Sequence, residues 1–203
     1  MPHPAHDAAS ARLSFLVLSQ TARMNLDEQL NPRGSTTSQG RHSGSQPDAS
    51  FIPRTLPTGR SRQWPSLVVE VGYTQTNNSL RMKARWWIGN SGGNVKIVVL
   101  IFINQTRAEM DFEVWENVPR QNPPITRPQA QGRQSNPTQT QQASARLQPA
   151  LQTIAVVGAP LRLPFRSVFL RNPNPNPLET DFSFSQQDIE SIAEAAWIEQ
   201  GFV

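Results

Sequence analysis

Residues 66–104 read SLVVEVGYTQTNNSLRMKARWWIGNSGGNVKIVVLIFIN, and this stretch decides the fold. Residues 66–71 are rich in valine and predict a strand, while residues 94–104, apolar on both faces after Lys96, predict a central strand. Between them, residues 79–90 place apolar side chains at i, i+4, i+7 and i+8, which is typical of an amphipathic helix. A strand, a helix and a strand with short joints predict a βαβ unit with a parallel strand pair.

The segment after this unit alternates between apolar and acidic residues, which predicts another strand. Residues 109–116 read EMDFEVWE and follow a turn at residues 104–107. One face of this strand is apolar and the other acidic, with Met110, Phe112 and Val114 set against Glu109, Asp111 and Glu113. We expect the apolar face to point inward and the acidic face to be solvated.

Helices and short strands are expected toward both ends of the chain. Apolar spacing over residues 13–30 favours a helix. Short strands are expected at residues 153–157 and 161–165. Ser185, followed three residues later by Asp188, forms a capping box before an apolar stripe, which predicts a terminal helix docked on the core.

The chain has 203 residues, enough for one domain with a substantial core. Residues 11–117 are expected to form most of that core after a flexible N-terminus at residues 1–10. Residues 118–149 are rich in Pro and Gln, cannot bury enough apolar surface to offset chain entropy, and predict a disordered insertion. Residues 150–203 then complete the same domain, and residues 31–45 are expected to form a loop or a short hairpin.

Composition excludes several kinds of site. The chain has no cysteine, which rules out a disulfide scaffold, a thiolate nucleophile and a zinc finger. Its three histidines, two of them in the N-terminus, argue against a histidine-rich metal centre. The apolar run at residues 15–18 is too short to span a bilayer. We therefore expect a soluble, intracellular protein with no membrane partner.

The charge balance suggests an anionic partner. The net charge is +4, and 17 of the 19 basic residues are arginine, which favours bidentate contacts with phosphate. Nucleic acid is therefore an expected partner, although a charge of this size also serves solubility alone. Three arginines, Arg54, Arg60 and Arg62, either contact a phosphate backbone or simply solubilise a loop.

Two acidic residues stand out. Glu70 lies inside the apolar run LVVEV, where burial without a partner would be costly. The ordinary explanations are a strand end that opens to solvent, or a buried ion pair with an arginine. Asp48 follows Pro47 in the segment QPDASFIP, and Pro-Asp is by itself a common turn dipeptide.

Together, these acids resemble a known motif. Asp48, then Glu70 22 residues later in a hydrophobic strand that leads into a helix and a second strand, resembles the PD-(D/E)XK nuclease superfamily, which has the restriction-endonuclease-like fold. More narrowly, residues 46–104 are similar to a branch of uncharacterised restriction-endonuclease relatives and to fungal uncharacterised proteins. The likeness implies an α/β fold with a mixed sheet and flanking helices.

The resemblance also implies a metal site. In that superfamily the two acids bind Mg²⁺ together with a backbone carbonyl, so Asp48, Glu70 and the carbonyl of Val71 are the implied ligands. The ion would polarise the scissile phosphate and help to generate hydroxide. The family lysine, two residues after the second acid, is replaced by Gly72.

Another lysine could supply the missing charge. Lys83 lies beside the apolar stripe of the predicted helix, so its ammonium could reach toward the sheet. Lys96, near the start of the next strand, is the alternative. The ordinary interpretation makes Lys83 a solvated helix position and Lys96 a strand-end residue that discourages aggregation.

Three further residues have a weaker place in this scheme. Glu28 loosely matches an additional acid that many of these nucleases carry. Trp86 and Trp87 could stack on bases, although aromatic pairs on a helix more often pack within the core and its rim.

Three functional hypotheses remain open. The first is a Mg²⁺-dependent nuclease that hydrolyses DNA phosphodiester bonds. The second is a catalytically inactive module that keeps the nuclease fold and binds nucleic acid or a protein. The third is an unrelated α/β protein in which Asp48 and Glu70 never meet.

Overall fold

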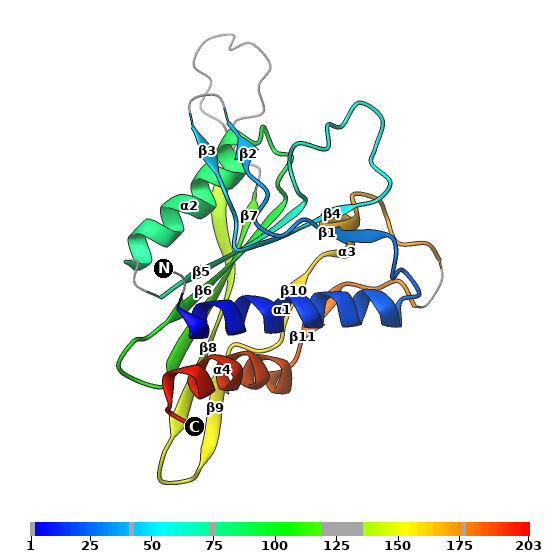
Figure 1. Ribbon diagram of the computed structural model, residues 1–203. Helices are drawn as coiled ribbons and strands as arrows, with labels where there is room; N and C mark the ends of the chain where they lie inside the picture. Colours follow the sequence, from blue (N-terminus) through cyan, green and yellow to red (C-terminus); the bar gives the residue numbers. More distant parts are fainter. Residues whose placement is uncertain (1–2, 41–42, 74–75, 119–135, 176–177) are drawn as a thin grey trace.

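A seven-stranded mixed sheet forms the centre of the protein (Figure 1). The computed structural model describes residues 3–40, 43–73, 76–118, 136–175 and 178–203. Only one neighbouring pair of strands in the sheet runs parallel, and the other pairs are antiparallel. In spatial order the strands are β1 (Leu30–Pro32), β4 (Ala49–Pro53), β5 (Leu67–Gly72), β6 (Ile97–Ile103), β7 (Glu109–Asn117), β8 (Pro137–Gln148) and β9 (Thr153–Val157).

Two small antiparallel pairs lie outside this sheet. They are β2 (Ser38–Gln39) with β3 (Gly44–Ser45), and β10 (Leu161–Leu163) with β11 (Phe182–Phe184). The first of them forms the short hairpin that was one of the two expectations for residues 31–45.

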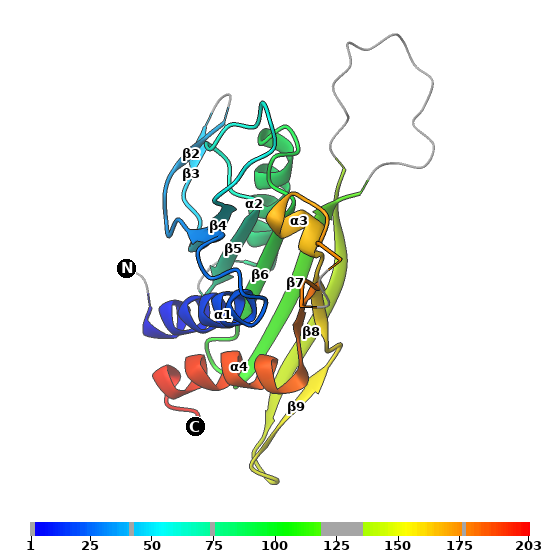
Figure 2. The same cartoon turned by 90° about the vertical axis from the view of Figure 1, so that its right-hand side faces the viewer.

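Helices cover both faces of the sheet. The helices are α1 (Pro4–Arg23), α2 (Asn77–Asn90), α3 (Phe165–Phe169) and α4 (Gln186–Gln200). Helices α1 and α4 pack against each other on one face, as Figure 2 shows, and share a core with Leu67, Val69 and Val71 of β5. Helix α2 packs on the opposite face with Val68. Successive residues of β5 therefore point to different helices, and Glu70 points toward α2.

The predicted βαβ unit is confirmed. Strands β5 and β6 are parallel, with Glu70 in register with Leu100, and α2 connects them. The mixed α/β fold with flanking helices is therefore confirmed as well. The capping box at Ser185 and Asp188 begins α4 as expected. Among the described residues, no helix combines the length and the apolarity needed to cross a bilayer.

The N-terminus differs from expectation. Residues 4–10, which we expected to be flexible, belong to α1, which ends at Arg23 instead of continuing to residue 30. Pro4 occupies a first-turn position, where its missing N–H is harmless, and the His3 side chain caps the Ala5 amide. This end of the helix is ordered because small side chains, including Ala5, are fully buried against the core.

The polar segment after β7 also differs from expectation in part. Residues 137–148, which we assigned to a disordered insertion, form β8 between β7 and β9. Backbone pairing on both sides stabilises this strand, and its small residues Ala143 and Ala145 reach the core. The rest of the predicted insertion, residues 119–135, lies outside the described residues.

Candidate acidic site

Asp48 lies just before β4, beside the strand that carries Glu70. Its amide donates to the carbonyl of Val69 at 3.1 Å, and its Oδ2 accepts from the amide of Val71 at 2.6 Å. The carboxylate thus extends the pairing of β4 with β5 beyond the end of β4. The structure therefore places Asp48, just before the start of β4, beside the strand that carries Glu70.

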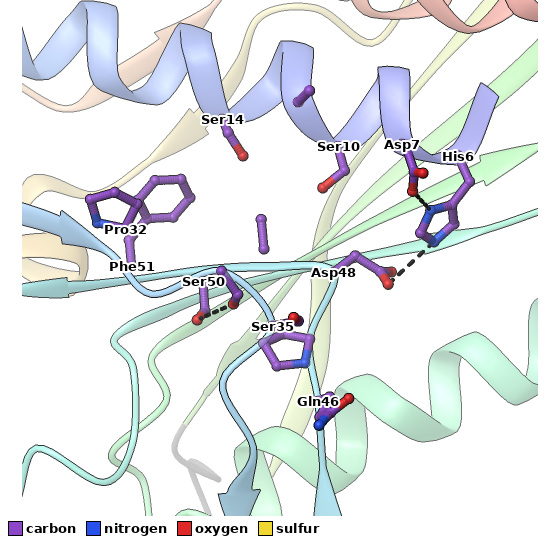
Figure 3. A pocket seen from close by; sticks show the side chains of 14 residues that line it. His6, Asp7, Ser10, Ser14, Pro32, Ser35, Gln46, Asp48, Ser50 and Phe51 are labelled. Carbon is purple, nitrogen blue, oxygen red and sulfur yellow. Dashed lines mark hydrogen bonds and ion pairs between the residues drawn. The ribbon is translucent and has the colours of Figure 1, made fainter. Parts of the chain in front are cut away.

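The second oxygen of Asp48 is bound to helix α1. His6 Nε2 lies 3.2 Å from Asp48 Oδ1, and His6 Nδ1 lies 3.0 Å from Asp7 Oδ1 (Figure 3). The hydrogen bond to Asp48 raises the pKa of His6 to about 9, against the opposing effect of burial and with a further contribution from Asp7. His6 is therefore an imidazolium near neutral pH, and it neutralises Asp48.

A cavity of about 530 Å³ opens beside this pair. It lies between α1 and the segments around β1 and β4, and Figure 3 shows Ser10 and Ser14 of α1 on the cavity side facing β4. The Asp48 side chain is 21% exposed, so solvent reaches it from this side.

Glu70 is in a different environment, because it is fully buried. Its Oε2 accepts from Lys83 Nζ at 2.8 Å, and its Oε1 accepts from the indole Nε1 of Trp87 at 2.6 Å. Burial raises the pKa of Glu70, Lys83 and Trp87 oppose that rise, and the charge of Asp48 makes the smallest contribution. Of the ordinary explanations for this acid, the buried ion pair is the one observed, with a lysine in place of the expected arginine.

The two acids are engaged from opposite faces of the sheet. Helix α1, which carries His6, packs on one face, whereas α2, which carries Lys83, packs on the other. Asp48 and Glu70 are neighbours in the sheet, but each is neutralised by a cation from a different helix.

A second buried glutamate has the same kinds of partner. Glu113 of β7 is in register with Leu100, which is itself in register with Glu70. Arg81 of α2 donates to both Glu113 oxygens, at 2.6 to 3.2 Å, and Trp115 Nε1 donates to Oε2 at 2.8 Å. We expected Glu113 to be solvated, but it is 4% exposed because α2 covers this part of the sheet. The environment of Glu70 is thus repeated at a residue outside the motif.

The position at which the resembled motif carries a lysine is filled by packing. Gly72 ends β5 on the same face as Glu70, and a Cβ at Gly72 would lie 3.0 Å from Cδ2 of Leu80. Leu80 is fully buried on α2. The space that a lysine side chain would need at this position is therefore occupied.

Lys96 is not brought to the site. Its amide donates to the carbonyl of Ser66, which places it four residues from Glu70 along the parallel strands, or roughly 13 Å. Its ammonium donates to the carbonyl of Gly93. Lys83 is the lysine that meets Glu70, because the helical spacing places it over β5.

The remaining predicted residues have other partners. Glu28 is exposed and pairs with Arg54 at 3.2 Å. Trp87 is fully buried, so it packs in the core and is not available to stack on a base, whereas Trp86 donates to Ser43 Oγ at 2.8 Å. For Val71, the amide contacts Asp48, and a role for its carbonyl remains a prediction.

The donor set does not fit a magnesium ion in this arrangement. Each of the four carboxylate oxygens of Asp48 and Glu70 already faces an N–H donor, and two of those donors are cationic. In the part of the chain that the structure describes, no three histidine or acidic side chains are grouped to hold a metal ion. Mg²⁺ requires nearly octahedral oxygen coordination, which these contacts obstruct.

Fold and site together define a mixed α/β domain with an internally neutralised acid pair. No protein-family model matches the chain, and no curated protein matches it significantly. Among solved structures, the chain is similar to a protein from Anabaena variabilis ATCC 29413 described as a "putative nuclease belonging to DUF820". The identity is 12%, the match covers 95% of this chain and 84% of that one, and the TM-score is 0.47.

We expect Gly72→Lys to lower the free energy of unfolding by about 1–3 kcal/mol, because the new side chain overpacks against Leu80. Urea denaturation followed by tryptophan fluorescence measures this. The double variant Gly72→Lys, Leu80→Ala should lose less than the sum of the single variants, because the two side chains compete for one space. Gly89→Lys, where a Cβ meets nothing within 4 Å, is the matched control. Equal stability of Gly72→Lys and the wild type would contradict the packing argument.

His6 should make stability depend on pH. Its pKa is raised from 6.5 to about 9 in the folded state, so its contribution is complete below pH 6.5 and is lost as the pH rises through 9. The contribution is at most about 3 kcal/mol, and partial exposure to solvent reduces it. The Tm difference between the wild type and His6→Gln should therefore shrink between pH 6.5 and 9.5. A difference that stays constant over this range would refute the His6–Asp48 ion pair.

Proposed function

We propose that the protein is a nuclease-like module that binds the phosphate backbone of nucleic acid and whose acid pair serves structure. One observation carries the structural part of this proposal. Glu70 is fully buried with both oxygens satisfied by Lys83 and Trp87, in the same manner as Glu113. A carboxylate with these partners stabilises the packing of α2 and does not meet a phosphate.

The proposed contact surface consists of Arg33, Arg54 and Arg62. Arg33 Nη1 donates to the carbonyl of Arg62 at 2.8 Å, and Arg62 Nη1 donates to the carbonyl of Arg54 at 2.8 Å. These contacts hold three guanidinium groups on neighbouring segments of the chain. Glu28, whose side chain is 83% exposed, pairs with Arg54 and offsets part of the charge.

Arg60 does not belong to this surface, although its sequence position suggested it. Its guanidinium is partly buried and donates to the side chain and the carbonyl of Asn94, at 2.7 and 2.8 Å, and to the carbonyl of Trp64. Arg60 therefore fixes its own loop. The three remaining arginines make their hydrogen bonds through Nη1, and planar guanidinium groups suit phosphate oxygens.

The triple variant Arg33→Gln, Arg54→Gln, Arg62→Gln tests the surface. Fluorescence anisotropy with a short labelled DNA duplex at several salt concentrations measures affinity. We expect the triple variant to bind DNA more weakly. The slope of log K against the logarithm of the salt concentration should be less steep by about 3, because about 0.9 counterions are released for each phosphate contact.

The matched control is Arg107→Gln, Arg162→Gln, Arg166→Gln, which removes the same charge from exposed arginines elsewhere. It should change the slope much less than the triple variant does. Equal effects of the two triple variants would show that net charge alone attracts DNA. No DNA binding by the wild type at low salt would reject the proposal.

A second candidate function is metal-dependent hydrolysis of DNA. One observation favours it: Asp48 and Glu70 lie on adjacent strands, with Lys83 at 2.8 Å from Glu70 in place of the lysine that position 72 lacks. This function requires Lys83 and Trp87 to release the Glu70 carboxylate.

The cleavage hypothesis has a direct assay. If it holds, the wild type nicks plasmid DNA with Mg²⁺ or Mn²⁺, and the double variant Asp48→Ala, Glu70→Ala is inactive. If both proteins show the same residual activity, that activity comes from a contaminant and the candidate is rejected.

A further inference from the structure

Each acid of the motif has its own internal cation. Lys83 Nζ lies 2.8 Å from Glu70 Oε2, and His6 Nε2 lies 3.2 Å from Asp48 Oδ1. Each acid therefore already has a basic partner without any added ion, and His6 also lies 3.0 Å from Asp7. A divalent metal between the same acids would compete with these partners for the same carboxylate oxygens.

The positions of these cations matter as much as their number. The Lys83 ammonium lies on Oε2 of Glu70, and the Trp87 indole N–H lies on Oε1. A metal ion that bound either oxygen at the usual distance of about 2.1 Å would sit beside these donors. Like charges repel strongly in a buried site, where water screens little. Binding would therefore require Lys83 to leave.

Access to the two acids also differs. Asp48 faces the cavity beside α1, whereas Glu70 has no exposed surface and lies under α2. Lys83 is about one-third exposed, so its side chain covers Glu70 on the solvent side. Removal of the lysine would both cancel the repulsion and open a route to the buried carboxylate.

We infer that Lys83 and His6 take the place of a divalent cation at the Asp48–Glu70 pair. The native chain then has no Mg²⁺ or Mn²⁺ site there, and removal of both internal cations creates one. This inference goes beyond the proposed contact with nucleic acid and does not depend on it, because it concerns the ion balance of the pair alone.

Mn²⁺ is the probe, since its binding can be followed by the loss of the free-ion electron paramagnetic resonance signal and by Tm. We expect the wild type to bind no Mn²⁺ at the pair up to about 1 mM. In the double variant His6→Gln, Lys83→Met we expect saturating Mn²⁺ to raise the Tm by at least about 5 °C, because a ligand that binds only the folded state stabilises it.

The matched control is His6→Gln, Arg81→Met. It loses the same charge and also frees a glutamate under α2, but Glu113 is not beside Asp48, so no gain from Mn²⁺ is expected. Addition of Glu70→Gln to the double variant His6→Gln, Lys83→Met should abolish the rise in Tm with Mn²⁺.

Two results would overturn the inference. One is Mn²⁺ binding by the wild type that Glu70→Gln removes. The other is a folded His6→Gln, Lys83→Met variant whose Tm does not respond to Mn²⁺.

If that variant does not fold, Lys83→Gln provides the milder replacement, and the titration of the wild type still decides whether the native pair accepts a metal. None of these measurements uses nucleic acid, so failure here and failure of the proposed function are separate outcomes.

Discussion

Burial of the Glu70 carboxylate is the constraint on which the arrangement of α2 depends. An ionised carboxylate with no exposed surface requires a cation and hydrogen-bond donors, and both come from α2 as Lys83 and Trp87. Removal of one partner from a buried pair typically costs about 3–5 kcal/mol. The same requirement at Glu113, met by Arg81, fixes the helix at a second point. These two contacts act together with the buried apolar face of α2 to hold the helix on the sheet.

Much of this region could be predicted because its signals are local. The two apolar strands, the helical spacing between them and the short joints of residues 66–104 define a βαβ unit without reference to the rest of the chain. The helical spacing also explains why Lys83 lies over β5. Lys96 comes just before β6 and therefore lies at the other end of the strand pair from Glu70. The proximity of Asp48 to Glu70 was predictable only through the resemblance to a known motif, because the two residues belong to segments that pair only in the folded chain.

The features that sequence patterns missed depend on tertiary packing. Alternation in β7 identifies the face on which Glu113 lies, but it does not reveal that α2 covers that face. The polar residues of β8 do not show the apolar pattern that predicts a strand. Backbone pairing on both sides and two buried alanines stabilise this strand instead. His6 lies 42 residues before Asp48 in the sequence, and only the docking of α1 brings them together. His6, Ser10 and Ser14 are spaced four residues apart and therefore lie on one face of the helix, which is a local sign of a polar contact.

Neutralisation by helices gives this acid pair a different physical role from a metal centre. A metal would draw both carboxylates toward one point, whereas here Asp48 is bound by α1 and Glu70 by α2, on opposite faces of the sheet. The pair therefore joins three layers: one helix, the sheet and the other helix. Leu80 completes this arrangement, since it packs against Gly72 where the motif lysine would stand. Metal binding at this pair would thus require more than one substitution, because Lys83 and His6 both occupy carboxylate oxygens that a metal would need.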